Sequence, residues 1–374
     1  MPAGLFRALL TVAGAVVAIL VAIGISSVAI VAAGANPGDA LAAFFNFGET
    51  DRSFANGLAQ MFNRAVPLFL AGLAVAVGFR MNLFNIGVEG QYRIAAVCAA
   101  YVGSTFVAPA PIQITVIIVV AAAVGGLYAL IPAVMKVTRG VNEVISTIML
   151  NYIAINLAAF LVRGPFAGER AEGQLTTTTP VLPESAWFPN MNWLLEAMGL
   201  PAPRGGGMWG FLLVAVVIGV ALWVVLERTK FGFDVKASGL NPSAAFASGI
   251  GPKRMVISAM VLSGAIAGLI GLPEILGDQH AFGTNFTPGL GYLGIAVALL
   301  GRNSPYGIAV AALLFAFLDR AQGPLQFADV PPSVITIMQG TIVLLVVVAN
   351  EITSRVALRR EERRAARQLG KVSA

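Results

Sequence analysis

Residues 113–135 read QITVIIVVAAAVGGLYALIPAVM and contain no charged side chain. About 20 consecutive apolar residues are enough for a helix to cross a bilayer. The composition agrees, since 57% of the 374 residues are hydrophobic and only 11% are charged, against about 25% charged in soluble domains. The apolar residues come in continuous blocks, without the alternation of a membrane β-barrel. The sequence therefore predicts an all-α, polytopic helical membrane protein.

Ten apolar blocks lie along the chain, which predicts about ten transmembrane helices. Their approximate bounds are residues 8–33, 61–79, 92–110, 113–135, 142–163, 208–226, 255–276, 289–301, 305–318 and 333–350. The first block is too long for the apolar core of a cleaved secretory signal. We expect one transmembrane domain, residues 1–350, followed by a basic cytoplasmic tail, residues 351–374.

The basic residues fix the expected orientation. Placing the N-terminus in the cytoplasm leaves 18 of the 24 Lys and Arg residues on the inner side. The positive-inside rule therefore predicts that both termini are cytoplasmic. Residues 164–207 then form a long external loop, and residues 227–254 form the longest cytoplasmic loop. Five spans on each side of the external loop would make an inverted 5+5 repeat.

The basic tail, which includes Arg359, Arg360, Arg363 and Arg364, has two interpretations. Nucleic-acid binding is one, but the position next to a span favours attraction to anionic cytoplasmic lipid. We therefore expect membrane lipid as a partner and no nucleic acid.

The chain lacks the sequence features of a soluble enzyme. No Gly-x-x-x-x-Gly-Lys-Ser/Thr loop is present, so any ATP hydrolysis by that route must come from another subunit. His280 is the only histidine, and no group of His, Cys and acidic residues has metal-ligand spacing. The one cysteine, Cys98, allows no internal disulfide and lies in an apolar run, where we expect it to pack. Transport or a membrane scaffold role remains.

Polar residues inside apolar regions are the strongest functional signal, because such side chains are costly in a bilayer unless they face a partner or water. The segment Arg80–Gln91, between the second and third spans, contains four of them: Asn82, Asn85, Glu89 and Gln91. It is compatible with a broken helix that lines a cavity. It is equally compatible with a tight cytoplasmic turn in which Gly87 and Gly90 serve only as turn residues.

A second polar group follows the fifth span. Glu143, Thr147 and Asn151 recur every four residues and so share one helical face. Such a face should contact other helices or water rather than lipid, and it either lines a pathway or bonds to neighbours. A third group, Glu274 with Asp278, Gln279 and His280, lies at the outer end of the seventh span. Pro273 and Gly277 indicate an interrupted helix there, although an ordinary solvated loop is the simpler interpretation.

The cytoplasmic loop contains a well-specified short helix. Asn241 is a good N-cap, Pro242 fits the first helical position and Gly249 is typical of a helix end. The side chains between them are small, and such a stiff helix could sit in a groove of another protein.

These residues resemble a known family. Ala244-Ala245-Phe246-Ala247-Ser248-Gly249 is similar to the Ala-Ala-x-x-x-Gly coupling loop of ABC importer permeases, with Ser243 where many members carry Glu. The segments 82–91, 140–151 and 294–305 resemble permeases of the branched-chain amino acid, ribose and nucleoside group, closest to its nucleoside and simple-sugar branch. The resemblance covers about residues 60–350.

The resemblance implies the transmembrane permease subunit of an ATP-driven importer in the bacterial plasma membrane, for nucleosides first and for simple sugars as the alternative. Its implied partners are cytoplasmic ABC ATPase subunits, a second similar permease and an external substrate-binding lipoprotein. The chain itself would bind no cofactor and would not be an enzyme. The residues expected to contact the ATPase are Asn241, Pro242, Ser243, Ala244, Ala245 and Gly249.

Under this hypothesis Asn82, Asn85, Glu89 and Gln91 contribute one wall of the substrate pathway. Glu143, Thr147 and Asn151 contribute the other. Two further classes of membrane protein are also compatible with the sequence. A secondary transporter would use Glu89, Glu143 or Glu274 as a proton-carrying carboxylate, and a membrane scaffold would tolerate every polar-to-alanine change.

Overall fold

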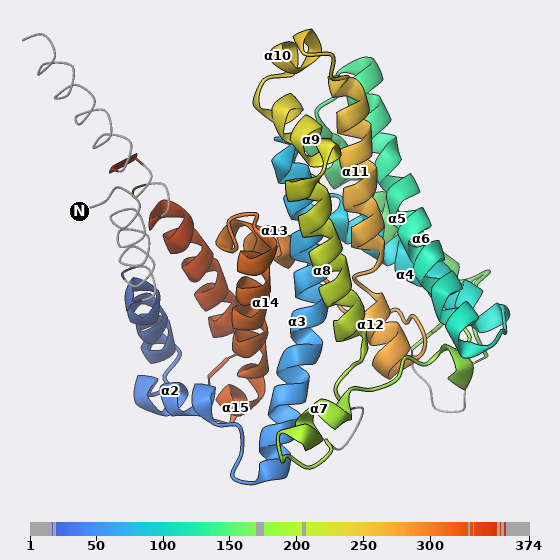
Figure 1. The fold of residues 1–374 in the computed structure, drawn as a ribbon. Helices are drawn as coiled ribbons and strands as arrows, with labels where there is room; N and C mark the ends of the chain where they lie inside the picture. Colours follow the sequence, from blue (N-terminus) through green and yellow to red (C-terminus); the bar gives the residue numbers. More distant parts are fainter. Residues whose placement is uncertain are drawn as a thin grey trace, which may run out of the picture. The chain divides into compact units, whose positions relative to one another are not determined.

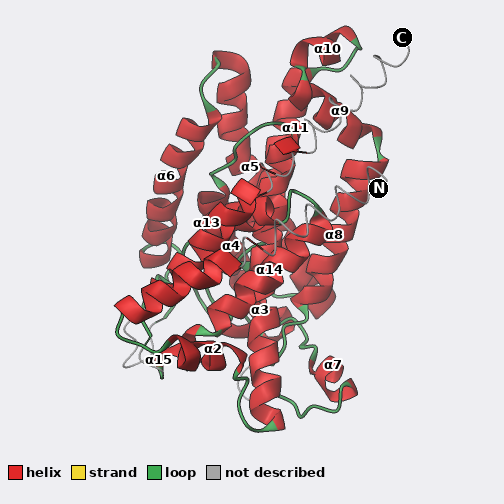
Figure 2. Cartoon of the chain, turned by 90° about the vertical axis from the view of Figure 1, so that its left-hand side faces the viewer, coloured by secondary structure: helices red, strands yellow, loops and turns green. Residues whose placement is uncertain are grey.

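The computed structural model describes residues 17, 20–169, 176–203, 207–327, 330–331, 333–349, 352 and 355–356. Within these ranges every regular element is a helix (Figures 1 and 2), accompanied by two isolated β-bridges, Thr178 with Gly283 and Asn190 with Trp209. The expected all-α architecture is confirmed. Most of the basic tail lies outside the described residues.

The chain divides into two compact units, Met1–Asn46 with Ala321–Ala374, and Phe47–Arg320. The first unit contains the helices Leu20–Ala32, α2 (Pro37–Phe45), α15 (Gln322–Gln326) and Ser333–Ala349. The second contains α3 (Asp51–Arg80), α4 (Val88–Thr105), α5 (Ala110–Arg139), α6 (Glu143–Arg163), η1 (Glu184–Ala186), α7 (Asn192–Ala197), α8 (Phe211–Arg228), α9 (Lys230–Leu240), α10 (Pro242–Ala247), α11 (Pro252–Gly268), α12 (Leu272–Glu274), the π-helix η2 (Ile275–Gln279), α13 (Leu290–Leu300) and α14 (Pro305–Arg320).

Among the described residues, six helices are long and apolar enough to cross a membrane. They are Asp51–Arg80, Ala110–Arg139, Glu143–Arg163, Phe211–Arg228, Pro252–Gln279 and Pro305–Gln326. A seventh crossing is available if Leu20–Ala32 and Pro37–Phe45, which are bent by 117°, act as one span. Leu290–Leu300 and Ser333–Ala349 are shorter apolar helices. Together with α4 these helices overlap the ten blocks, the first of which begins outside the described residues. The multi-pass architecture follows.

Helix α3 forms the centre of the larger unit. Its residues from Ala65 to Gly78 are almost all buried, which is typical of a helix that is apolar on every side. Helices α11, α13 and α14 pack along it, and Figure 1 shows α8 beside it as well. The outer helices behave differently: α5, α6 and α8 expose large apolar side chains such as Leu127, Phe160 and Val217, as helices facing lipid would.

Glycine contacts bring α5 and α11 close together. A Cβ added to Gly125 would lie 2.9 Å from the Cα of Gly268, and a Cβ on Gly264 would collide with Ala129. Small residues at such crossings let two backbones approach within van der Waals contact. The Gly264–Gly268 stretch therefore packs α11 against α5.

Two features differ from the sequence expectation, and a third agrees with it. Helix α4 begins at Val88 rather than near residue 92, so Glu89 and Gln91 belong to its first turn. Residues 227–254 hold a second helix, α9, whose Thr229 N-cap side chain accepts a hydrogen bond from the Gly232 amide. The seventh span is broken after Gly268 and continues as α12 and the π-helix, as the expected interruption near Pro273 requires.

The close approach of α5 and α11 predicts a strong effect at Gly268. We expect Gly268→Leu to destabilise the folded protein by about 1–3 kcal/mol, because the added side chain must push the Ala121 carbonyl away. The measurement is the thermal midpoint of the purified protein in detergent. Gly24→Leu is the matched control, since a Cβ at Gly24 meets nothing within 4 Å. Equal midpoints for the two variants would contradict the packing argument.

Candidate transport site and coupling helix

The segment between α3 and α4 turns back into the helix bundle. Helix α3 ends at Arg80, and Asn82 takes a left-handed conformation with φ 59°, which asparagine tolerates better than most residues. The Leu83 amide then donates to the Gly78 carbonyl at 3.0 Å, so the chain reverses within one helical turn. The connection that follows runs beside the helices instead of continuing away from them.

The hydrogen bonds of this segment show how deep it lies. Asn151 on α6 donates to the Ile86 carbonyl at 2.8 Å and accepts from the Gly90 amide at 2.9 Å. Asn151 is eight residues beyond Glu143, where α6 begins, which is about 12 Å along the helix at 1.5 Å per residue. The segment is therefore a buried, re-entrant connection and not a solvated turn.

Two amides hold the middle of this connection. Asn85 and Gln91 exchange a pair of hydrogen bonds, each 3.0 Å long. Asn85 also donates to the Ser263 hydroxyl on α11 at 2.8 Å, and Ser263 in turn donates to the Ala74 carbonyl on α3 at 2.6 Å. Asn85 and Gln91 are each 1% exposed and Ser263 is 0% exposed. Non-helical backbone at this depth is tolerated only when protein surrounds and satisfies it.

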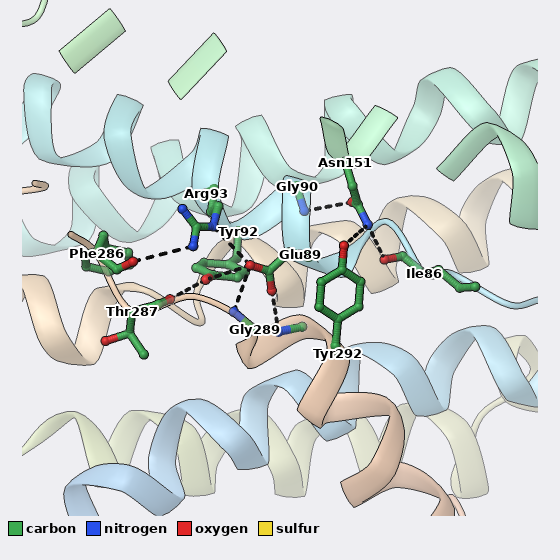
Figure 3. A network of polar contacts seen from close by, with 11 residues as sticks. Ile86, Glu89, Gly90, Tyr92, Arg93, Asn151, Phe286, Thr287, Gly289 and Tyr292 are labelled. Atoms are coloured by element: carbon green, nitrogen blue, oxygen red, sulfur yellow. Dashed lines mark hydrogen bonds and ion pairs between the residues drawn. The ribbon is translucent and has the colours of Figure 1, made fainter. Parts of the chain in front are cut away.

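Glu89 joins the beginnings of two helices. Its carboxylate, 2% exposed, accepts from the backbone amides of Gly289 and Gly291, both at 3.0 Å, at the start of α13. It also pairs with Arg93 at 3.0 Å, one turn further along α4. Figure 3 shows this carboxylate between Arg93 and Gly289, with Tyr92 beside it. The Tyr92 hydroxyl donates to the Thr287 carbonyl at 2.5 Å.

The electrostatics of this arrangement are balanced. A buried carboxylate is costly unless charge and hydrogen bonds compensate it. Here Arg93 supplies the opposite charge, and the first amides of α13 supply the partial positive charge of a helix N-terminus. Arg93 lies inside the larger unit, half-buried against Glu89.

The expected site residues therefore separate into two groups. Asn85, Glu89, Gln91, Thr147 and Asn151 lie together, all buried. Asn82 is exposed, at the end of α3. Glu143, at the start of α6, forms an ion pair of 2.6 Å with Lys136.

The polar face of α6 bonds to its own chain. The Thr147 hydroxyl donates to the Glu143 carbonyl at 2.6 Å, and Asn151 also reaches the Tyr292 hydroxyl at 3.4 Å. Tyr292 is 46% exposed. Sequence reasoning missed this residue, along with Tyr92, Ser263 and the start of α13. The Gly289-Leu290-Gly291 stretch was the available signal, because two glycines at a helix start allow another backbone to approach.

The short helix expected in residues 227–254 is confirmed as α10. The Asn241 side chain accepts from the Ala244 amide at 3.0 Å, Pro242 occupies the first turn, and Gly249 has φ +80° after the helix end. A cavity of about 630 Å³ adjoins it, lined in part by Ser243, Phe246 and Arg254. Phe246 is 74% exposed. This is unusual for a large apolar side chain, because the sequence predicts that α10 lies outside the bilayer, in water.

Helix α9 connects α10 to the re-entrant segment. A Cβ added to Gly239 would lie 2.8 Å from the Arg80 carbonyl and 2.9 Å from the Met81 Cα, so α9 is seated against the end of α3. Met81 begins the turn that leads into the buried connection. Any displacement of α10 and α9 therefore presses directly on this turn.

The third polar group lies at the other end of the unit. Glu274 ends α12, where it accepts from the Thr287 hydroxyl at 3.0 Å and from Gln279. His280 stacks on Trp187 with ring centroids 4.0 Å apart. Burial against this ring lowers the pKa of His280, because desolvation disfavours its charged form. The loop that contains Trp187 thus packs on this group, so the group is not part of a freely solvated loop.

Comparison with known proteins identifies the family. Residues 57–347 match the family described as "Branched-chain amino acid transport system / permease component". The chain belongs to this permease family. The permease is 34% identical over 342 residues to the glucose ABC transporter permease protein TsgB13 of Haloferax volcanii, covering 90% of this chain and 87% of the relative.

Two further relatives carry nucleoside names. The guanosine ABC transporter permease protein NupP of Bacillus subtilis is 33% identical over 77% of the permease and 80% of its own length. The nucleoside ABC transporter permease protein NupB of Lactococcus lactis is 31% identical over 79% and 80%, respectively. No solved structure matches the chain. The resemblance found in the sequence is confirmed, and the relatives are transporter permease subunits rather than enzymes.

The buried pair of Glu89 and Arg93 predicts a distinctive stability pattern. We expect Glu89→Ala to lower the free energy of unfolding by about 3–5 kcal/mol, because it leaves Arg93 buried without its partner. Removing both charges in Glu89→Ala with Arg93→Ala should restore part of that loss. The measurement is a double-mutant cycle of thermal stability in detergent.

The control is the pair of Arg80 and Glu227, whose carboxylate side chain is 40% exposed. Glu227→Gln should cost less than about 1 kcal/mol, as expected of a surface pair. A Glu89→Ala variant no less stable than Glu227→Gln would show that the Glu89 contacts do not hold α4 and α13 together.

Proposed function

We propose that this chain is the membrane-spanning permease of an ATP-driven importer whose substrate is a nucleoside, with a simple sugar as the second candidate. The observation that carries the proposal is the continuous packing from the coupling-type helix α10 through α9 to the turn at Met81, where the re-entrant polar segment begins, in a member of this permease family. The nucleoside assignment rests on the NupP and NupB relatives, and the sugar alternative rests on TsgB13.

The chain would cross the bacterial plasma membrane ten times with both termini in the cytoplasm. The positive-inside distribution supports this topology, and so does the position of α10 and α7 at opposite ends of the larger unit (Figure 1). The expected external loop and cytoplasmic loop would then face opposite sides of the membrane, as an importer requires.

The packing of the larger unit also supports the inverted repeat. Helices α3, α4 and α5 correspond in order to α11, α13 and α14. In this pairing α5 packs on α11 while α14 packs on α3, so the two halves exchange equivalent contacts. Helices α4 and α13 both begin at a glycine N-cap, Gly87 and Gly289, that follows a non-helical connection. Five spans per half would relate the halves by a two-fold axis in the membrane plane.

ATP would be bound and hydrolysed by cytoplasmic ATPase subunits and not by this chain, which needs no cofactor of its own. The remaining partners would be a second similar permease, membrane lipid and an external substrate-binding lipoprotein. The seven pathway residues Asn82, Asn85, Glu89, Gln91, Glu143, Thr147 and Asn151 would act in two ways. Asn82 is exposed and free to contact solute, whereas the buried members would shape the pathway by holding α4, α6 and α13 in register.

An ion-driven transporter is less well supported. Its three candidate proton carriers are all engaged: Glu89 and Glu143 are in ion pairs, and Glu274 accepts two hydrogen bonds. A carboxylate that carries protons must lose and regain its charge during transport, and a fixed cationic partner opposes that change.

The coupling role predicts a loss of partner binding. We expect Phe246→Ala to lower the amount of ATPase subunit that co-purifies with the tagged chain by about tenfold, because truncating a central exposed aromatic of an interface commonly costs 2 kcal/mol or more. Gly249→Trp should do the same by distorting the left-handed helix end. Phe327→Ala is the control, since Phe327 is 93% exposed but lies outside this segment. Full recovery of the ATPase with Phe246→Ala would argue against α10 as the contact.

The energy source predicts a separate outcome. In cells that express the complete complex, uptake of labelled uridine should stop when ATP is depleted and should continue when an uncoupler removes the proton gradient. Labelled glucose is assayed in parallel to test the sugar alternative. Uptake that survives ATP depletion and collapses with the uncoupler would assign the chain to ion-driven transport.

A further inference from the structure

A cavity of about 340 Å³ opens in the larger unit at the end opposite α10, between α3, the start of α8 and the π-helix. Asn63, Arg64, Trp209, Glu274, Asp278 and Thr287 lie on its walls. The volume lies at the lower end of the roughly 300–1,000 Å³ range of small-molecule sites. A compact solute of one or two rings fits this size, while a peptide does not.

Two of the polar wall residues, Asn63 and Arg64, already bond to other parts of the chain. The Asn63 amide donates to the Gly207 carbonyl at 2.9 Å, and its oxygen accepts from the Trp209 amide at 2.8 Å. The Arg64 guanidinium donates to Asp319 at 2.6 Å, and this carboxylate offsets much of its charge. The remaining positive field of Arg64 acts on Glu274. These residues fix the position of α3 against the loop before α8.

The two acidic wall residues are not neutralised in the same way. One Glu274 oxygen accepts from Thr287 and Gln279, but its second oxygen has no hydrogen-bond partner in the described part of the chain. Asp278 makes no hydrogen bond or ion pair with any described residue, and it is exposed. The cavity therefore offers acceptor-only carboxylate oxygens beside the aromatic ring of Trp209.

We propose that this cavity is an outer binding site for the transported solute, selective for neutral, hydroxyl-rich rings over their phosphorylated forms. The site rests on the importer function proposed above and names the class of solute that it admits. Carboxylate oxygens accept hydrogen bonds from sugar hydroxyls, and such charge-assisted bonds are stronger than neutral ones. A phosphate group would instead meet two like charges, which is a repulsive arrangement.

Thr287 connects this cavity to the buried helix junction. Its hydroxyl lies on the cavity wall and donates to Glu274, while its carbonyl accepts from Tyr92. Figure 3 shows Thr287 next to the Glu89 carboxylate and the start of α13. A solute that rearranges the Glu274 contacts therefore acts on the connection that precedes α13. The cavity is in direct contact with the elements proposed to form the pathway.

Protection from a thiol reagent tests occupancy of the cavity directly. Gln60 lines the cavity and is exposed, so Gln60→Cys in a Cys98→Ala background provides a single reactive thiol at its mouth. The complete transporter is held in ATP-depleted membranes and treated with a membrane-impermeant thiol reagent. At a solute concentration ten times the half-saturating value, uridine or glucose should slow labelling by about tenfold. Uridine 5′-monophosphate should not slow it.

Glu196→Cys on α7 is the control thiol, because Glu196 is exposed in the same external loop region but does not line the cavity. Its labelling should not respond to any solute. Equal labelling of Gln60→Cys with and without solute, in a complex that imports that solute, would overturn the proposal. Equal protection by uridine and its monophosphate would overturn the selectivity.

Charge removal supplies a second test on the same thiol. Glu274→Gln should raise the uridine or glucose concentration that gives half protection by about tenfold, the loss expected when one charge-assisted hydrogen bond is weakened. Glu274→Gln with Asp278→Asn should also let uridine 5′-monophosphate protect Gln60→Cys, which is a gain that misfolding cannot produce. Glu196→Gln is the matched neutral control.

Different results would contradict the importer function and the outer binding site. Wild-type complex that imports neither uridine nor glucose contradicts the proposed substrates of the importer. Wild-type complex that imports one of them, with acidic variants indistinguishable from Glu196→Gln in transport and in protection, leaves the importer function standing and removes the outer site.

Discussion

The larger unit depends on one buried carboxylate that caps a helix other than its own. Glu89 lies in the first turn of α4, and its two oxygens accept the Gly289 and Gly291 amides at the start of α13. The first amides of any helix have no partner within that helix. In most helices a local side chain or water satisfies them, but α13 has no side-chain cap of its own. The carboxylate therefore fixes where α13 begins and how α4 is oriented against it.

Several other features follow from this junction. Because α4 starts inside the bundle, the connection from α3 must enter the bundle to reach it. The polar groups of this connection then need hydrogen-bond partners, which Asn85, Gln91 and Asn151 supply. The space around it is so tight that a Cβ on Gly90 would lie 2.9 Å from the Asn151 Cα. Helices α3, α11 and α6 all contact this irregular segment, through the Gly78 carbonyl, Ser263 and Asn151, respectively.

The sequence predicted the membrane class, the positions of the apolar helices and the limits of α10, because these depend on local signals. Long apolar runs, an Asn-Pro helix start and a glycine stop act within a few residues. It also selected Asn85, Glu89, Gln91 and Asn151 as unusual, because a polar side chain in an apolar run stands out whatever its partner is.

The partners themselves could not be predicted. Glu89 and Gly289 are separated by 200 residues, and the pairing depends on how α4 and α13 cross, which no local pattern encodes. The choice between a surface turn and a buried connection after Arg80 was open for the same reason: composition is identical in both, and only the contacts with Ser263 and Asn151 distinguish them. Helix α9 was missed because its two glycines and one serine lower the local helix propensity. Its packing against α3 compensates for that loss, and the sequence does not show this contact.

The continuity of contacts from one end of the unit to the other has a mechanical consequence. From α10, contacts pass through α9 to the turn at Met81, through the re-entrant segment to Glu89, and through Tyr92 to Thr287. Each step is a backbone contact or a buried hydrogen bond, and dense packing leaves little free volume to absorb a displacement. A movement imposed on α10 cannot be taken up locally by the small side chains around it. We expect such a movement to shift α4 and α13 together, because breaking their shared carboxylate contacts would leave a buried charge without its partners.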